Sequence, residues 1–289
     1  MGTSLFHRGT SVEPAGRDRY VADLGEQWNC PIVPQGGIVA ATAARAMQAA
    51  LGDPAQPLRS LNAVFAGQVR HGPVEIEVVV LRRGRSVSQL RASLRNPGAS
   101  AGFDAMAVFG SEREGFTFTD AEPPDGVKPP LECPSYRDPE PEGFQEDRPR
   151  FNFWANVEGR PTLGHAPWDD YEAESSLCAS WYRFDDPPRG EDGTWDPLAL
   201  VTLCDTMPGA VGERLGAEER RRSWLPPSVD LTVHVLGEAR CDWVLAVNRA
   251  RHAGDGYASA DMELWDVDGG RSPRLVAYAT QTMLFSFPK

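Results

Sequence analysis

The chain has 289 residues, 41% of them hydrophobic, and its 41 Asp and Glu against 29 Lys and Arg give a formal net charge of −12. Such acidity argues against nucleic-acid binding, which needs a basic face to neutralise phosphates. Because the mean hydropathy is −0.40 and no apolar run approaches the roughly 20 residues of a membrane helix, we expect no membrane partner either.

The N-terminus and the cysteines predict a cytoplasmic protein. The opening stretch MGTSLFHRGTSVEPAGRD contains no apolar signal-peptide core. The five cysteines form an odd set without the CxxC spacing of zinc sites, which favours reduced thiols. The five histidines also lack a ligand spacing. We therefore expect no metal and no cofactor.

The clearest predicted helix covers residues 37–51, where only three side chains are polar. A helix that is apolar almost all round is buried. Gly36 and Gly37 stand at its head, but Pro34 precedes them and no third glycine follows, so a dinucleotide-binding fingerprint does not fit. The pair either relieves crowding where the helix meets a sheet, or lets a substrate carbonyl reach the helix N-terminus, where N–H groups stabilise an oxyanion.

Four segments of strand length follow this helix, separated by turn signals, at residues 60–69, 73–83, 86–96 and 102–110. A buried helix followed by antiparallel strands indicates an α+β fold. Arg82, Arg83 and Arg85, around the turn between the second and third strands, are the local basic cluster of an acidic chain. They form either a solvated turn or a site for the phosphates of an anionic carrier.

Residues 119–147 interrupt this pattern with proline, glycine and acidic side chains, which predicts a linker between an N-terminal unit (1–118) and a C-terminal unit (148–289). The second unit repeats the first. Asp196 and Pro197 open a helical stretch that Pro208 must break. Strands are predicted around it at residues 151–159, 176–184, 228–237, 242–251, 257–267 and 274–287.

Matched positions of the two units lie 168 to 172 residues apart, which indicates an internal structural repeat. A helix wrapped by about four strands is the hot-dog arrangement. We therefore predict a double hot dog, with the two sheets edge to edge so that aggregation-prone strand edges are removed.

Three polar residues are candidates for the chemistry. At a separation of 168 residues Gly37 corresponds to Asp205, so one half would supply backbone N–H groups and the other a carboxylate that orients or activates water. Gln281 shares a strand face with small apolar residues, where its amide is either satisfied structurally or positions a water or a ligand. Alternation places Ser228 on the polar face of its strand, beside Asp230. No G-x-S-x-G motif marks any serine as a nucleophile.

The order and spacing of these segments resemble the type II (TesB-like) acyl-CoA thioesterases, which are double-hot-dog proteins. The resemblance is carried by PQGGIVAATAARAM and VLRRGRSVSQLRASL in the first half, and by LCDTMPGA, SVDLTVHV, YASADMELWD and LVAYATQTMLF in the second. It extends over roughly residues 20–120 and 150–287.

The resemblance implies an enzyme that hydrolyses an acyl thioester of coenzyme A or of a carrier protein. A water would be positioned by Asp205, by the hydroxyl of Ser228, where many relatives have threonine, and by Gln281. The N–H of Gly36 or Gly37 would face the acyl oxygen. The family further implies no metal, no covalent nucleophile and a homo-oligomer. The alternative is a non-hydrolytic hot-dog protein, either an acyl-binding subunit or a dehydratase-like enzyme, although the latter would need a histidine.

Overall fold

The structure, a computed structural model, describes residues 3–139, 141–142, 151–222, 224–268 and 272–287. The first half contains α1 (Leu5–Gly9), β1 (Glu13–Gly16), β2 (Arg19–Leu24), α2 (Gly36–Leu51), β3 (Leu58–Phe65), β4 (Gly72–Arg82), β5 (Val87–Arg95) and β6 (Phe103–Gly110). The second contains β7 (Val157–Leu163), β8 (Leu177–Phe184), α3 (Pro197–Cys204), α4 (Pro208–Arg221), β9 (Asp230–Val235), β10 (Val244–Gly254), β11 (Tyr257–Asp266) and β12 (Arg274–Leu284).

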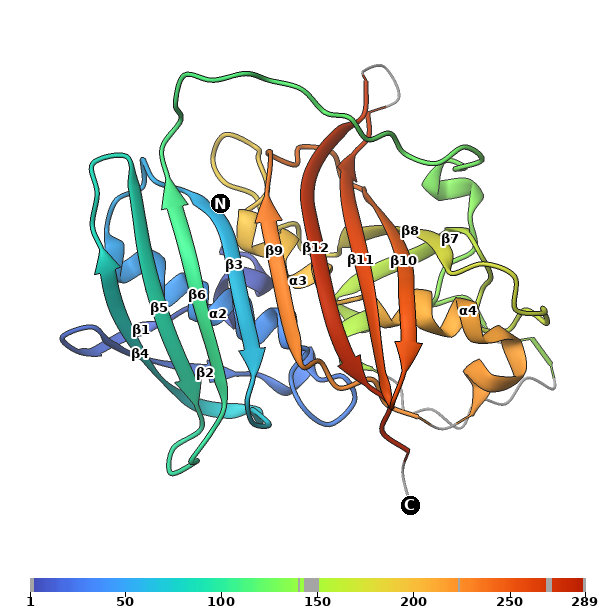
Figure 1. Cartoon of the computed structure of the whole chain (residues 1–289), viewed down its shortest axis with the longest axis horizontal. Coiled ribbons are helices and arrows are strands. Elements are labelled where there is room, and N and C mark those ends of the chain that lie inside the picture. The colour runs from blue at the N-terminus through green and yellow to red at the C-terminus, as the bar shows by residue number, and fades with distance from the viewer. Residues whose placement is uncertain (1–2, 140, 143–150, 223, 269–271, 288–289) are drawn as a thin grey trace.

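The described strands form one antiparallel sheet in the order β1-β2-β4-β5-β6-β3-β9-β12-β11-β10-β8-β7 (Figure 1). This order is mirrored about the contact between β3 and β9, where Leu61 pairs with Val233. The edge strands β1 and β7 contain Pro14 and Pro161, and proline discourages pairing with a further strand. The predicted α+β double hot dog, with its two sheets edge to edge, is confirmed.

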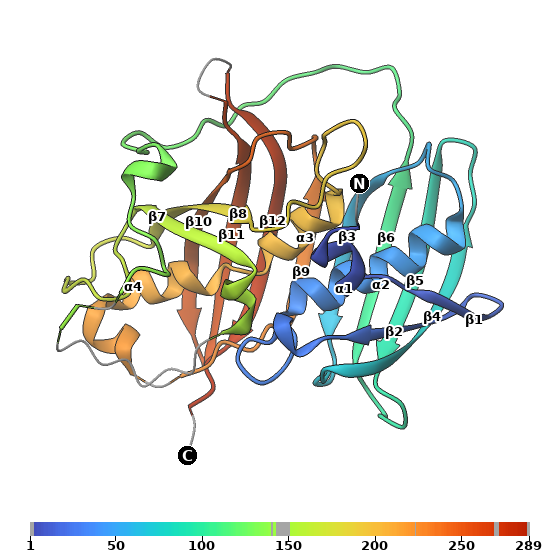
Figure 2. The same ribbon diagram turned by 180° about the vertical axis from the view of Figure 1, so that it is seen from behind.

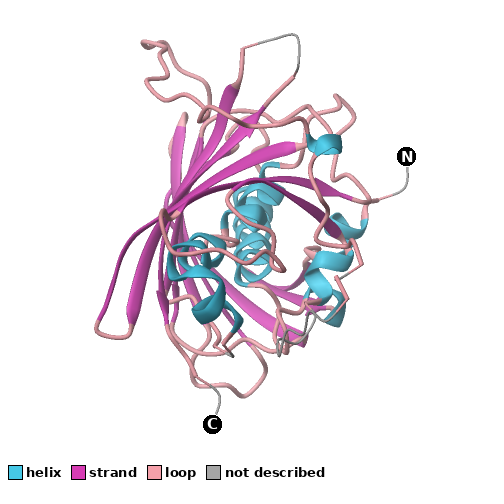
Figure 3. Ribbon diagram, turned by 90° about the vertical axis from the view of Figure 1, so that its right-hand side faces the viewer, coloured by secondary structure: helices cyan, strands magenta, loops and turns pink. Residues whose placement is uncertain are grey.

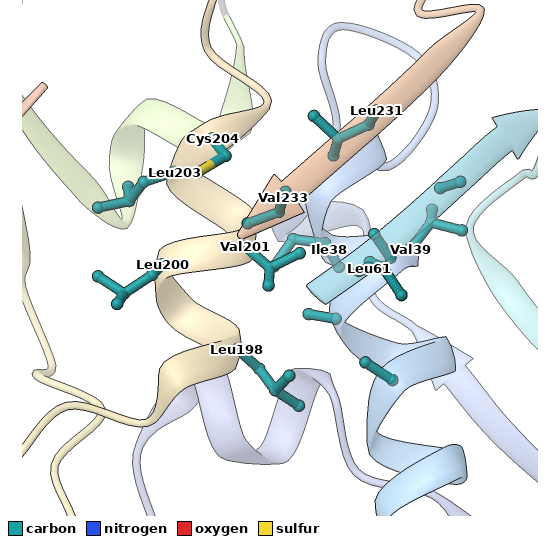
Figure 4. Packing of buried hydrophobic residues seen from close by; sticks show 14 of the residues in the cluster. Ile38, Val39, Leu61, Leu198, Leu200, Val201, Leu203, Cys204, Leu231 and Val233 are labelled. Carbon is teal, nitrogen blue, oxygen red and sulfur yellow. The ribbon is translucent and has the colours of Figure 1, made fainter. Parts of the chain in front are cut away.

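The central helices lie on the concave side of this sheet (Figures 2 and 3). In the first half α2 packs against β4, β5 and β6, while α3 packs against α2 and β9. Ile38 and Val39 of α2 and Leu198 and Val201 of α3 belong to one buried cluster at the junction between the halves (Figure 4). Small side chains let α2 be surrounded by other elements, and its alanines at 40, 41, 43, 44 and 46 are fully buried.

Two local predictions were wrong or incomplete. The strand predicted at 151–159 is a 3-10 turn at Asn152–Ala155 followed by β7. The turn is held because the backbone N–H of Phe153 donates to the carbonyl of Asn29, a partner far away in the sequence. The short elements α1, β1 and β2 were not predicted: β1 is four exposed residues, and the alternation of Tyr20, Ala22 and Leu24 in β2 is interrupted by the apolar Val21.

The described part of the predicted linker packs on the outer face of the C-terminal half (Figure 1). Cys133 joins Trp181, Leu245 and Trp265 in a second, smaller hydrophobic cluster. The indole N–H of Trp181 donates to the carbonyl oxygen of Lys128 at 2.8 Å. Within the described residues, no helix has the length and apolar character needed to cross a membrane.

Candidate active site

The structure brings Asp205, Ser228 and Gln281 together in one hydrogen-bonded cluster. The hydroxyl of Ser228 donates to Asp205 Oδ1 at 3.0 Å. Gln281 Nε2 donates to Ser228 Oγ at 2.7 Å and also to Asp205 Oδ1. A carboxylate, a hydroxyl and an amide thus converge from three separate elements.

Asp205 stands at the break between α3 and α4. It is the C-cap of α3, and Pro208 begins α4. Proline has no backbone N–H to continue the hydrogen-bond ladder and its ring clashes with the carbonyl of the preceding turn, so the helix breaks here. The break leaves the carbonyl oxygen of Asp205 to a partner outside the helix, and Asp205 is half-buried with its side chain turned toward the first half of the chain.

Ser228 differs from the prediction that placed it on a polar strand face. Strand β9 begins at Asp230, and Ser228 makes only an isolated bridge to Met283. Because Ser228 precedes the regular strand, alternation does not determine its direction, and its hydroxyl reaches Asp205. Gln281 matches the prediction, since it is 2% exposed and shares its strand face with buried Ala277, Ala279 and Met283.

The glycine pair meets Asp205 across the two halves, as the repeat indicated. The N–H of Gly37 donates to Asp205 Oδ2 at 3.0 Å, so this donor faces the carboxylate and not an open acyl site. A Cβ on Gly36 would lie 2.8 Å from Asp205 Oδ2, and one on Gly37 would lie 2.6 Å from the carbonyl oxygen of Thr202. The two glycines therefore permit close approach of α2 to the α3–α4 break.

Gln35 is a site residue that the sequence analysis missed. Its Nε2 donates to the carbonyl oxygens of Thr202 at 2.9 Å and Asp205 at 3.2 Å, while its Oε1 accepts from the N–H of Ile38 at 3.0 Å. Gln35 thereby caps α2 and ties its N-terminus to the end of α3. Glutamine is not one of the residues that typically cap a helix, and nothing local identifies a partner 170 residues away.

Burial raises the pKa of Asp205 from 3.8 to about 6. Hydrogen bonds from Ser228, Gln281 and the backbone N–H groups of Gly37 and Gly36 oppose that rise because they favour the charged carboxylate. A carboxyl group with this pKa is mainly ionised at neutral pH and yet basic enough to accept a proton. Its perturbation in a cluster of polar groups is typical of a functional site.

The amide of Gln281 leaves one polar atom unsatisfied. Among the described residues, its Oε1 is buried and has no hydrogen-bond partner. Buried polar atoms nearly always have a partner, whether from the protein or from ordered water. This oxygen therefore marks a place beside Asp205 where a water or a substrate donor would be favoured.

The basic cluster lies apart from these residues. Arg83 donates to the carbonyl oxygens of Leu51 at 2.5 Å and Ala50 at 3.0 Å, at the C-terminal end of α2. Because α2 has 16 residues, that end is about 24 Å from the Asp205 end. Arg82 and Arg85 are exposed. In the part of the chain that the structure describes, no group of three His, Cys, Asp or Glu is arranged to hold a metal ion.

Several solved structures share this architecture. A hot-dog protein of unknown function from Alicyclobacillus acidocaldarius is 27% identical, with a TM-score of 0.78 and 100% of both chains covered. The acyl-CoA thioesterase II TesB2 from Mycobacterium marinum is 20% identical, with a TM-score of 0.74 over 98% of this chain and 99% of that one. The tesB protein from Mycobacterium avium subs paratuberculosis is 18% identical, with a TM-score of 0.67 over 98% of each chain.

Family models match both halves of the chain, although no curated protein matches it significantly. The acyl-CoA thioesterase N-terminal domain matches residues 24–110, and the acyl-CoA thioesterase C-terminal domain matches residues 130–285. Each model falls on one hot-dog half, and together they include Gly37, Asp205, Ser228 and Gln281. The chain therefore belongs to the acyl-CoA thioesterase family and is a thioester hydrolase.

Proposed function

We propose that the chain hydrolyses acyl-CoA thioesters with a water held by Asp205, Ser228 and Gln281. The observation that supports this proposal is the convergence of these three side chains at the N-terminus of α2. The cluster contains a base with a raised pKa, a hydroxyl that hydrogen-bonds to it and an amide with a free acceptor. A thioester is an activated acyl group, so a base of modest strength suffices.

In the proposed reaction the carboxylate of Asp205 takes a proton from the water as the water oxygen attacks the thioester carbonyl carbon. A C–O bond forms, and the carbonyl electron pair moves onto the acyl oxygen. When this tetrahedral intermediate collapses, the C–S bond breaks and its electron pair leaves with sulfur. Asp205 then returns its proton to the thiolate, which yields a carboxylic acid and a free thiol.

The neighbouring groups have distinct roles in this proposal. Ser228 and Gln281 orient the water, and Gln281 Oε1 accepts one of its hydrogens. The acyl oxygen is placed at the N–H of Gly36 or Gly37, where the helix dipole favours negative charge. Because the Gly37 N–H now donates to Asp205, a substrate oxygen that takes this donor would remove a hydrogen bond from the carboxylate and make it more basic.

The test is steady-state hydrolysis of a panel of acyl-CoAs by the wild type and Asp205→Asn. The variant keeps the shape but removes the base, so kcat should fall about 10²- to 10⁴-fold while substrate binding persists. Ser228→Thr, which keeps the hydroxyl, is the matched control and should be nearly silent. Wild-type turnover by Asp205→Asn would overturn the assignment. A wild type that binds acyl-CoA without hydrolysing it would favour an acyl-binding protein.

Arg82 and Arg85 are expected to meet phosphates of the carrier, whereas Arg83 is committed to the end of α2. Removing the charges of Arg82 and Arg85 should raise KM in a salt-dependent way with little change in kcat. An unchanged KM would indicate that these arginines only form a solvated turn and do not bind the carrier. The expected homo-oligomer is tested by light scattering.

A further inference from the structure

A second buried amide lies on the inner face of the C-terminal half, in β10. Asn248 is 3% exposed, and its Oδ1 has no hydrogen-bond partner among the described residues. A buried amide oxygen without a partner destabilises the folded state. Gln281 Oε1 is in the same condition, so two unpaired amide acceptors occur in the same half of the fold.

The strand register places both amides on one face of the sheet. Asn248 pairs with Met262 of β11, and Gln281 pairs with Ala260 of the same strand, two residues away. The two amides are therefore two strands apart across the sheet and two residues apart along it, which corresponds to roughly 12 Å. Met262 and Ala260 of β11 lie between them on this face, and Ala250 and Ala279 lie beside them.

The other half of the chain shows that this fold does not need an amide at either position. Because the strand order is mirrored, the pair Asn248–Met262 corresponds to Val78–Ala92 in the first half. Likewise the pair Gln281–Ala260 corresponds to Ala107–Leu90. Val78 and Ala107 are buried, apolar core residues. Both amides thus occupy positions whose equivalents in the first half hold apolar core side chains.

The surroundings of Asn248 favour a neutral polar ligand. Helix α4 packs over β8, β10 and β11. Its Glu213 is hydrogen-bonded to His165 Nδ1 at 2.6 Å and lies 3.7 Å from Arg220 Nη1. Cys178, the partner of Asn248 on β8, has its pKa raised to about 12 by burial and by Glu213, so it is a neutral thiol. Because Glu213 already occupies Arg220 and His165, this cluster offers no spare cation to a ligand carboxylate.

We infer that Asn248 recognises a hydroxyl on the acyl group of the substrate. This inference rests on the proposed function, because it takes Gln281 as the residue beside the thioester. A hydroxyl can donate to Oδ1 and accept from Nδ2, whichever way the amide is turned. An extended chain advances about 1.2 Å per bond, given about 3.6 Å for the three bonds of one residue. The hydroxyl therefore lies roughly ten bonds from the thioester carbon.

The test compares 10-hydroxydecanoyl-CoA with decanoyl-CoA in the wild type and in Asn248→Leu, which keeps the approximate shape of the side chain. The wild type should prefer the hydroxylated substrate in kcat/KM, and Asn248→Leu should shift the ratio toward decanoyl-CoA by about 10- to 100-fold. Val78→Ala, at the equivalent position of the first half, disturbs core packing away from this face and removes no side-chain hydrogen bond, so it should leave the ratio unchanged. 3-Hydroxydecanoyl-CoA should gain no such preference.

Binding measurements separate this inference from the proposed function. Calorimetric titration of both thioesters into Asp205→Asn, with and without Asn248→Leu, reports recognition without turnover. Hydrolysis with the same ratio in the wild type and Asn248→Leu would overturn the hydroxyl site and leave the thioesterase proposal intact. A hydroxyl preference in binding that Asn248→Leu abolishes, in a chain that hydrolyses no thioester, would support the site and overturn the proposed function.

Discussion

Asp205→Asn should change how the stability of this protein depends on pH. The pKa of Asp205 is raised from 3.8 to about 6 in the folded state. One pKa unit corresponds to about 1.36 kcal/mol, so ionisation of this carboxyl removes about 3 kcal/mol from the free energy of unfolding. Asparagine has a similar shape and does not ionise, so the variant is free of this penalty.

The sign follows from the order of the two pKa values. The folded protein keeps the Asp205 proton up to about pH 6, whereas the unfolded chain releases it near 3.8. The stabilising contribution is fully present below about pH 4 and is lost as the pH rises through about 6. The free energy of unfolding of Asp205→Asn minus that of the wild type should therefore increase by about 3 kcal/mol between acidic and neutral pH.

Urea unfolding at a series of pH values, followed by circular dichroism, measures this difference. In Asp205→Asn an NH₂ group replaces one carboxylate oxygen and faces a hydrogen-bond donor of the site. One hydrogen bond is therefore lost, which costs about 1–3 kcal/mol. That loss does not depend on pH, so it changes the difference in unfolding free energy by the same amount at every pH. The same exchange at exposed Asp125 controls for the removal of one acid group. A difference that stays flat from about pH 4 to 7 would refute the reasoning that burial raises the pKa of Asp205.

We expect four further outcomes, two for catalysis and two for stability. The kcat/KM profile should have an acidic limb with its midpoint at about 6, set by Asp205, and constant activity through this range would exclude Asp205 as the base. Gln35→Leu removes both hydrogen bonds from α2 to the end of α3 and should lower kcat more than it raises KM; unchanged kinetics would leave Gln35 only a helix cap. Gly37→Ala should destabilise the protein by about 1–3 kcal/mol, because its Cβ would meet the Thr202 backbone at 2.6 Å; an unchanged Tm would contradict this contact. Arg83→Met should lower the free energy of unfolding by about 1 kcal/mol, because the hydrogen bonds to the carbonyl oxygens at the end of α2 are lost. Urea unfolding measures this change, and a urea midpoint equal to that of the wild type would argue against a stabilising role for Arg83.

The sequence by itself determined the double hot dog and two of the three central side chains. The buried helix at 37–51 follows from its nearly uniform apolar composition, and the strands follow from alternation, both of which are local properties. The repeat was enough to relate Gly37 to Asp205, because one symmetry axis relates the two halves of a mirrored fold and equivalent positions near that axis lie close together. Gln281 was recognisable since an amide is unusual among small apolar residues on one strand face.

Only the tertiary structure decided what these groups contact. The direction of Ser228 depends on β9 beginning at Asp230, and alternation has no meaning outside the strand. The N–H of Gly37 donates to Asp205, and Gln35 bonds to its carbonyl, across 168 and 170 residues of sequence. Such contacts exist because α2 and the α3–α4 break pack together when both halves share one sheet. The local sequence pattern predicts which residues are buried. Whether two helix ends contact each other depends on how the whole chain packs.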